Sequence, residues 1–269
     1  MKDSHLWSTR RSSELGAAAA DPRSVVVIPV GSIEQHGPHL PVATDSQIAW
    51  RIAEEAVLMA RKEVPVLLAP LVSIGCSEHH MEFAGTLSLE EDTFIRAMTE
   101  IGLSMTRHGF RRLFFLNGHG GNEAPLQLVV NRIRHATGGT VIAAAASYWR
   151  FIQQEVGRLR RSAPGGISHS GEFETCAMLA IDESSVDMSK ATRFLPQWTN
   201  GYFMPGWYVP STVQLGFHLS DMTETGVMGD PTDATAERGE AFLKAGSGAI
   251  AEFLTAFADW EFDRLYGAS

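Results

Sequence analysis

Apolar and polar positions alternate along the chain in blocks that predict strands followed by helices. Three short runs are almost continuously apolar, which is typical of parallel strands covered on both faces. They span residues 25–31, 66–73 and 112–117, and a fourth strand is expected at 140–148. Apolar residues at helical spacing follow each of the first three runs and close the chain. The expected helices span 46–62, 91–108, 123–136 and 235–260.

This order of elements predicts an α/β fold. Strands that alternate with helices favour a largely parallel sheet with helices on both faces and right-handed crossovers. A chain of 269 residues fits one such domain, so we expect a single domain over residues 1–269. Residues 1–22 form an N-terminal extension with a helix near Ser12 to Ala20. Residues 194–231 are irregular and rich in Trp and Tyr, which suits a rim or a subunit contact.

Charge and cysteine content narrow the class of protein. The net charge of -9 argues against a surface for nucleic acid or anionic membrane. Cys76 and Cys176 are too few for a disulfide framework, which favours a reducing compartment. The first residues lack the apolar core of a signal peptide, and no run of about 18 apolar residues predicts a membrane span. We therefore expect a cytoplasmic protein that binds neither nucleic acid nor membrane.

The loop after the first strand gathers residues that bind metals. Glu34, His36, His39 and Asp45 follow the strand within residues 28–45, IPVGSIEQHGPHLPVATD. Glu34 and His36 are two residues apart, so in an extended segment they project to the same side. Carboxylates and imidazoles on an irregular loop at the end of a core strand are a common way to mount a metal. The alternative is an acidic surface loop in which Asp45 caps the next helix.

Two further loops carry histidines at corresponding places. Residues 75–86 hold two adjacent histidines after the second strand, and His119 lies among glycines in Gly118-His119-Gly120-Gly121-Asn122 after the third. The glycine loop lacks the spacing of a phosphate-binding motif. In open parallel sheets, ligands bind beyond the carboxyl ends of the strands, where all three loops are expected. One site built from three loops is therefore the natural prediction.

A fourth motif lies at the start of a predicted helix. Residues 168–175, SHSGEFET, place Glu172 and Glu174 near a helix N-terminus. Acidic residues there also stabilise the helix dipole, so a purely structural role stays open.

Five motifs in the same order resemble the creatininase family of metal-dependent amide hydrolases. They are GSIEQHGPHLPVATD, HMEFAGTLSL, NGHGGN, HSGEFET and GVMGDPTDAT, between about residues 24 and 245. The resemblance implies a three-layer α/β/α fold with a mostly parallel sheet. It also implies assembly as a homo-oligomer, commonly a hexamer.

The resemblance also implies a set of metal ligands. By motif, Glu34, His36, Asp45 and His119 are ligands, and Asp45 bridges two divalent ions. In creatininase itself a further glutamate lies two residues after the motif histidine, where this chain has Gly121. Most relatives with NGHGGN use the glutamate of the HxGE motif instead, which here is Glu172. The chain is thus expected to be a member other than creatininase proper.

This ligand set predicts hydrolysis by a metal-activated water. Two ions lower the pKa of a bound water from 15.7 to about 7 and polarise a carbonyl. Imidazole and carboxylate together suit Zn²⁺ or Mn²⁺, and Fe²⁺ is also compatible. His169 is the candidate acid or base, in a catalytic centre that includes Glu172; its alternative role is support of a ligand.

The remaining polar residues of these loops are assigned to the substrate. The resemblance implies that His80 contacts substrate or supports a ligand. Ser77, Glu78 and His79 are further candidate substrate contacts, and His39 is expected to brace its loop rather than bind metal.

The predicted function is hydrolysis of a C–N bond in a small amide, cyclic amide or formamide. One alternative is a hydrolase that opens a cyclic ketone in sugar or inositol catabolism by breaking a C–C bond. Others are a peptidase of a modified peptide and a catalytically inactive binding protein.

Overall fold

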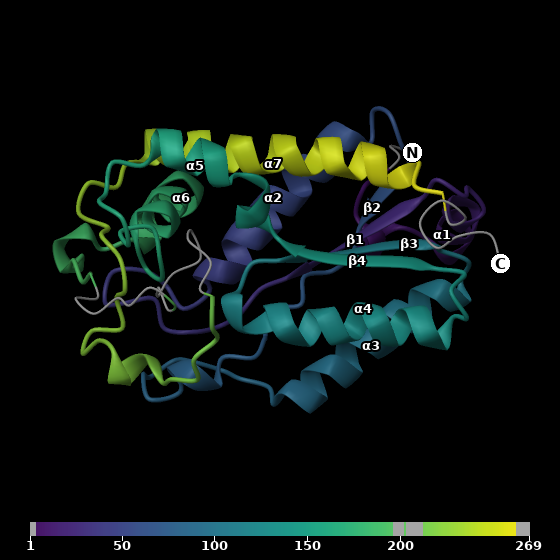
Figure 1. The fold of residues 1–269 in the computed structure, drawn as a ribbon. Coiled ribbons are helices and arrows are strands. Elements are labelled where there is room, and N and C mark those ends of the chain that lie inside the picture. The colour runs from purple at the N-terminus through teal and green to yellow at the C-terminus, as the bar shows by residue number, and fades with distance from the viewer. Residues whose placement is uncertain (1–3, 196–201, 203–211, 262–269) are drawn as a thin grey trace.

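Four strands form one parallel sheet in the order β2-β1-β3-β4 (Figure 1). The structure is a computed structural model that describes residues 4–195, 202 and 212–261. The strands are β1 (Val25–Val30), β2 (Val66–Leu68), β3 (Arg112–Asn117) and β4 (Ile142–Ser147). Val25 lies opposite both Val66 and Arg112, so the three strands begin in register. The carboxyl ends of the strands consequently meet at one edge.

Helices cover both faces of this sheet. They are α1 (Ser12–Ala19), α2 (Thr44–Ala60), α3 (Glu91–Arg107), α4 (Glu123–Ala136), α5 (Gln153–Leu159), α6 (Glu172–Asp182) and α7 (Ala236–Ala258). In Figure 1, α2 and α7 lie above the sheet, and α3 and α4 lie below it. Helix α7 packs against both α2 and α6. The predicted three-layer α/β/α fold is confirmed.

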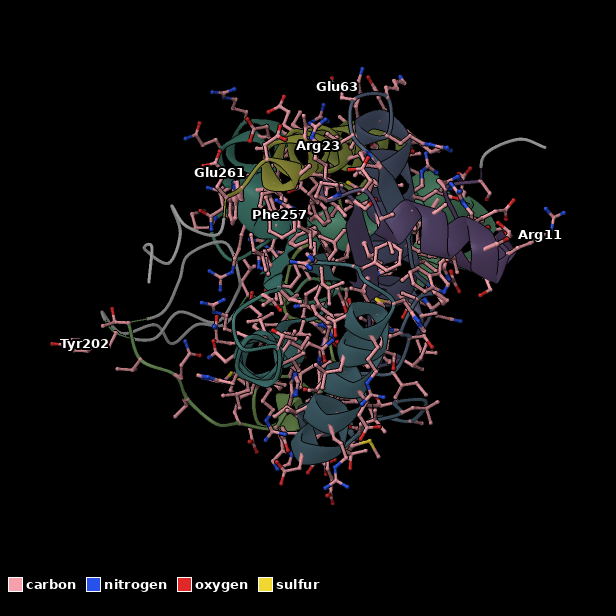
Figure 2. The ribbon with its side chains drawn as sticks, turned by 90° about the vertical axis from the view of Figure 1, so that its right-hand side faces the viewer. Arg11, Arg23, Glu63, Tyr202, Phe257 and Glu261 are labelled. Atoms are coloured by element: carbon pink, nitrogen blue, oxygen red, sulfur yellow. The ribbon has the colours of Figure 1, made fainter. Side chains whose placement is uncertain are left out.

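The strands alternate in the layer that they contact. Val25 and Val27 of β1 pack with α2 and α7, whereas Val26 and Ile28 pack with α3 and α4. This alternation follows from the period of two in a strand, and burial on both faces explains why the strands read as unbroken apolar runs. Phe257 lies in the interior of the upper layer, as Figure 2 shows.

Several predicted boundaries differ from those of the structure, and two of the differences bear on the loops at the carboxyl edge. The strand expected to reach residue 73 ends at Leu68, because Pro70 has no N–H to donate to a ladder, and only Val72 pairs again, with Val30. Helix α2 begins at Thr44 rather than at residue 46, with Ala43 as its N-cap. Asp45 therefore lies inside the first turn and does not cap the helix.

Helix α7 has the length and composition of a membrane span but packs as a core helix. Among the described residues, α7 alone is long and apolar enough to cross a membrane by length and composition, and its buried side packs on α2 and α6 as in a core helix.

In the predicted irregular segment, residues 194–231, Phe194 and Gly229 pair through two main-chain hydrogen bonds. Trp198, Trp207 and Tyr208, which suggested a subunit contact, lie outside the described residues.

Candidate metal centre

One buried amide holds together the three loops at the carboxyl edge of the sheet. Asn122 donates from Nδ2 to the carbonyl of Gly31 at 3.0 Å and accepts at Oδ1 from the N–H of Cys76 at 2.9 Å. It also donates to Asn117 Oδ1. The Asn117 side chain in turn donates to the carbonyl oxygen of His119 and accepts from the N–H of His119. These bonds join the loops that follow β1, β2 and β3.

Carboxylates and imidazoles from these loops converge in the interior. His119 Nδ1 lies 3.0 Å from Glu34 Oε2 and 3.0 Å from Asp45 Oδ2. His36 Nε2 lies 3.1 Å from Asp45 Oδ1 and 3.8 Å from Glu174 Oε2. Candidate ligand atoms form three overlapping groups, each within 4.8 Å. They are Glu34, His36 and His169; Glu34, Asp45 and His119; and His36, Asp45 and Glu174.

Burial and mutual attraction shift the pKa values of these groups strongly. Burial alone would raise the pKa of Glu34, but His119, His80 and His36 around it lower it well below its ordinary value. Burial alone would lower the pKa of His36, but Asp45 and the other carboxylates raise it to about 10. His119 is likewise raised well above its ordinary pKa, because Glu34 and Asp45 outweigh burial. The cluster is thus a tightly coupled set of opposite charges.

The same cluster has the chemistry of a divalent-metal site. Its carboxylates and imidazoles are the ligands that Zn²⁺ and Mn²⁺ accept. Asp45 Oδ2 is buried and makes no hydrogen bond of acceptable geometry within the described part of the chain, although His119 lies close to it. A buried carboxylate oxygen without a hydrogen-bond donor is suited to bind a cation. The residues present therefore fit a metal.

The structure corrects the place of Glu172. Its carboxylate accepts from the N–H groups of Arg161 and Ser162 and pairs with the buried guanidinium of Arg238, so it is fully occupied there. Two residues along an α-helix turn the side chain by about 200°, which puts Glu172 and Glu174 on opposite sides of α6. Glu174, and not Glu172, joins His36 and Asp45. The only sequence signal for it was a second acidic residue in the first turn.

Position 121 has no room for a side chain. A Cβ at this position would lie 2.1 Å from the carbonyl oxygen of Cys76 and 2.5 Å from His119 Nε2. No side chain fits there without a backbone shift. The glutamate that creatininase itself carries at this place is therefore excluded here by packing, and Glu174 brings a carboxylate from α6.

The candidate substrate residues are placed differently from one another. Ser77 is buried and donates from its hydroxyl to Glu34 Oε2 at 2.8 Å, and His80 Nε2 lies 3.3 Å from Glu34 Oε1. Both therefore support a cluster carboxylate in this structure. Glu78 is exposed at the start of a short 3-10 helix, Glu78–His80. His79 is stacked on His119 with 5.6 Å between ring centroids, so its ring borders the site.

His169 and His39 also lie near the cluster. His169 Nδ1 lies 3.6 Å from Glu34 Oε1, and its ring is 4.4 Å from that of His36. Burial and repulsion by His36 lower the pKa of His169 well below its ordinary value. His39 shares a 3.0 Å hydrogen bond between Nε2 and the hydroxyl of Thr175, which ties the ligand loop to α6.

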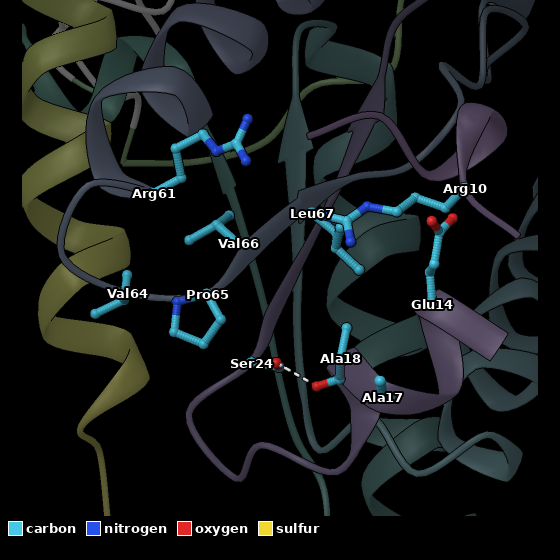
Figure 3. A pocket seen from close by; sticks show the side chains of 10 residues that line it. All are labelled: Arg10, Glu14, Ala17, Ala18, Ser24, Arg61, Val64, Pro65, Val66 and Leu67. Atoms are coloured by element: carbon cyan, nitrogen blue, oxygen red, sulfur yellow. Dashed lines mark hydrogen bonds between the residues drawn. The ribbon is translucent and has the colours of Figure 1, made fainter. Parts of the chain in front are cut away.

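A hollow of about 310 Å³ lies elsewhere, at the amino ends of β1 and β2 (Figure 3). Its lining includes Glu14 of α1, Ser24 and the apolar side chains of residues 64–67. It contains no histidine, and the only acidic residue in its lining is Glu14. The metal-ligand chemistry is at the opposite edge of the sheet.

Comparison with known proteins agrees with this geometry. The sequence model of the creatininase family, described as creatinine amidohydrolase, matches residues 9–254. A mycofactocin precursor peptide peptidase of Mycobacterium tuberculosis is 34% identical over 226 residues, covering 82% of this chain and 80% of that protein. A creatinine amidohydrolase of Pseudomonas putida is 28% identical over 70% of this chain and 75% of its own. A 3-dehydro-scyllo-inosose hydrolase of Thermotoga maritima is 26% identical over 64% of this chain and 57% of its own.

Solved structures show the same fold. A mutant creatininase of Zn–Zn type has a TM-score of 0.81 at 23% identity, covering 95% of this chain and 98% of that chain. A creatininase with Mn has a TM-score of 0.75 at 24% identity, covering 94% and 98%. With the family match over most of its length and hydrolases among its relatives, the chain belongs to the creatininase family of hydrolases.

Proposed function

We propose that the protein hydrolyses an amide C–N bond with two divalent ions held by the buried cluster. The observation that carries this proposal is the overlap of the candidate ligand groups. Asp45 belongs to one group with Glu34 and His119 and to another with His36 and Glu174. A carboxylate shared by two groups is suited to bridge two ions. Asp45 is thus the proposed bridge, with two further ligands on each side.

The proposed ions are Zn²⁺ or Mn²⁺, and Fe²⁺ also suits the ligand set. The Zn–Zn and Mn forms of solved creatininases support this choice. When bound, such ions lower the pKa of a water from 15.7 to about 7 and polarise the substrate carbonyl. Cleavage of the C–N bond also requires a proton for the leaving nitrogen.

The chain's own residues supply orientation and that proton. Ser77 and His80 contact the two different oxygens of Glu34, which stops the carboxylate from rotating. His169 directs Nδ1 toward the same carboxylate from 3.6 Å, at the border of the cluster. A histidine beside the reacting carbonyl is suited to move a proton to the leaving group. The proposed roles are therefore support for Ser77 and His80, and acid–base transfer for His169.

The substrate of this reaction is proposed as a small amide, cyclic amide or formamide. A second candidate is the amide bond of a short peptide. It is favoured by the 34% identity to a peptidase of a precursor peptide, against 28% to a creatinine amidohydrolase. Both substrates need the same attack on an amide carbonyl, so the cluster suits either one.

A substrate panel tests the proposal. Protein loaded with Zn²⁺ or Mn²⁺ is incubated with small amides, lactams, formamides, short peptides and cyclic ketones. The matched control is Asp45→Asn, which keeps the shape of the side chain and removes its charge. We expect C–N cleavage that the control loses. Turnover of cyclic ketones alone would favour C–C hydrolysis, and no turnover by the loaded protein would contradict the proposal.

A further inference from the structure

Gln35 lies between two candidate metal ligands in the sequence, Glu34 and His36, and its side-chain amide has a defined orientation. Its Oε1 accepts from the N–H of Gly37 at 2.9 Å, and its Nε2 donates to the carbonyl of Gly226 at 3.2 Å. A backbone N–H only donates and a carbonyl only accepts, so the amide cannot be flipped. Gln35 is 5% exposed, and these partners are therefore not replaced by bulk water.

The backbone at Gly226 is shaped around this amide. Gly226 has φ +77, and a Cβ there would lie 2.0 Å from Gln35 Oε1. A side chain at position 226 would be strained and would also displace the amide. The backbone of Gly226 thus lies directly against the side-chain amide of Gln35, which belongs to the loop after β1.

The amide also contacts two histidines of the site. Gln35 Nε2 lies 3.0 Å from His80 Nδ1 and 3.0 Å from His169 Nε2. His169 Nε2 in turn lies 2.9 Å from the main-chain oxygen of Gln35. Three acceptor candidates therefore surround an amide nitrogen that has only two hydrogens.

When each ring carries a single proton, only one assignment satisfies every group. The main-chain oxygen of Gln35 accepts only, so His169 Nε2 carries a proton and donates to it. That nitrogen then takes no hydrogen from the amide, whose two hydrogens go to Gly226 and to His80 Nδ1. If His169 Nε2 instead lacked its proton, the Gln35 main-chain oxygen and one of the amide's other acceptors would lose their donors. Unsatisfied buried acceptors are costly.

We propose that Gln35 is a positioning residue that fixes the tautomers of His80 and His169, with the proton on Nε2 in both rings. For His80, this directs an N–H toward Glu34 Oε1 at 3.3 Å and holds that carboxylate in place. For His169, it leaves a bare Nδ1 facing the cluster. That nitrogen can take a proton from the attacking water and then pass it to the leaving nitrogen. The tautomers rest on hydrogen bonding alone, whereas their use in catalysis rests on the proposed function.

Imidazole nitrogen NMR measures the tautomers directly. Spectra of ¹⁵N-labelled protein, metal-free and with Zn²⁺, separate a nitrogen that carries hydrogen from one that does not. The rings are identified by the signals that disappear in His80→Asn and His169→Asn. We expect Nε2 to be protonated in both rings of the metal-free protein, and a proton on Nδ1 with a bare Nε2 in either ring would overturn the proposal. Because the metal-free spectrum needs no activity, failure of the proposed function leaves this result readable.

The variant Gln35→Glu tests the role of the amide. It replaces the donating nitrogen by an oxygen opposite His80 Nδ1, so that ring should take its proton on Nδ1. We expect kcat to fall about 10- to 100-fold, with a smaller change in KM, as for other residues that orient a ligand. The control Gln127→Glu makes the same chemical change at an exposed position of α4. Unchanged tautomers and turnover in Gln35→Glu would contradict the proposal. If the variant does not fold, the tautomers in the spectrum of the parent protein still test the proposal.

Discussion

Two glutamates in the first turn of α6 show how different the two sides of one helix can be. Glu172 faces Arg238 and the N–H groups of residues 161 and 162, which together satisfy its charge. Glu174 faces Asp45 and Glu34, and burial together with repulsion by these two carboxylates raises its pKa to about 7, although His36 opposes the shift. Both side chains are buried, so exposure does not distinguish them.

The difference lies in what each carboxylate lacks. Glu172 has a complete set of protein partners, which is typical of a structural ion pair. Glu174 accepts from the N–H of Ser170 and lies near His36, but burial and the neighbouring carboxylates Asp45 and Glu34 still disfavour its charge. Perturbed acids in such clusters are candidates for function. Neutralising each glutamate separately tests this difference.

The largest effect is expected for Glu174→Gln. Glutamine keeps the size of the side chain and an acceptor for Ser170 N–H but removes the charge beside His36 and Asp45. We expect turnover of the substrate found in the panel to be abolished, while thermal unfolding stays close to that of the parent. Activity close to the parent's would remove Glu174 from the site.

Glu172→Gln is expected to affect stability instead. It leaves Arg238 buried without its counter-charge, which typically costs about 3–5 kcal/mol. Urea unfolding measures this loss. A second change, Arg238→Met, should restore part of it, since replacing both members of a buried pair is often neutral. A stable Glu172→Gln protein without activity would mean that the two glutamates have been assigned in the wrong order.

A smaller loss is expected for Gly121→Ala. The new Cβ would press on Cys76 and His119, and overpacking of this kind costs about 1–3 kcal/mol. It should also weaken metal binding, because His119 must shift. Gly120→Ala is the control, since a Cβ there meets nothing within 4 Å. Equal stability and metal affinity in the two variants would contradict the packing argument.

The smallest effect is expected for Thr175→Val. It removes the hydroxyl that bonds His39 on the opposite loop, which costs about 1 kcal/mol. Metal content should not change, because His39 braces the loop and is not proposed as a ligand. Isothermal titration with Zn²⁺ measures the affinity. A loss of metal in this variant would place His39 among the ligands.

The sequence predicts most of the fold because the elements have strong local signals. β3 and α4 have the predicted bounds, since an unbroken apolar run and a regular helical pattern define them. β2 is shorter than predicted because Pro70 interrupts pairing, an effect that the apolar pattern alone does not show. The loop histidines come together as the parallel order requires.

The partners of individual side chains were less predictable. Glu172 and Glu174 differ only in which neighbours α6 meets, and Arg238 lies 66 residues away along the chain. The sequence suggests a substrate contact for Ser77, yet its hydroxyl donates to Glu34 on the loop that follows β1. The sequence pattern does not indicate that Gln35 contacts two histidines or that Asn122 joins the loops. Such contacts depend on tertiary packing, which a single sequence does not specify.

Elemental analysis of the parent, Glu174→Gln and Glu172→Gln proteins, purified without chelator and reported as metal per chain, tests the central claim most directly. A site of two ions bridged by Asp45 and completed by Glu174 predicts about two equivalents of Zn or Mn in the parent. Glu172→Gln should keep this content in its folded fraction, and Glu174→Gln should lose metal. No metal in the parent after incubation with either ion, or full content in folded Glu174→Gln, would contradict it.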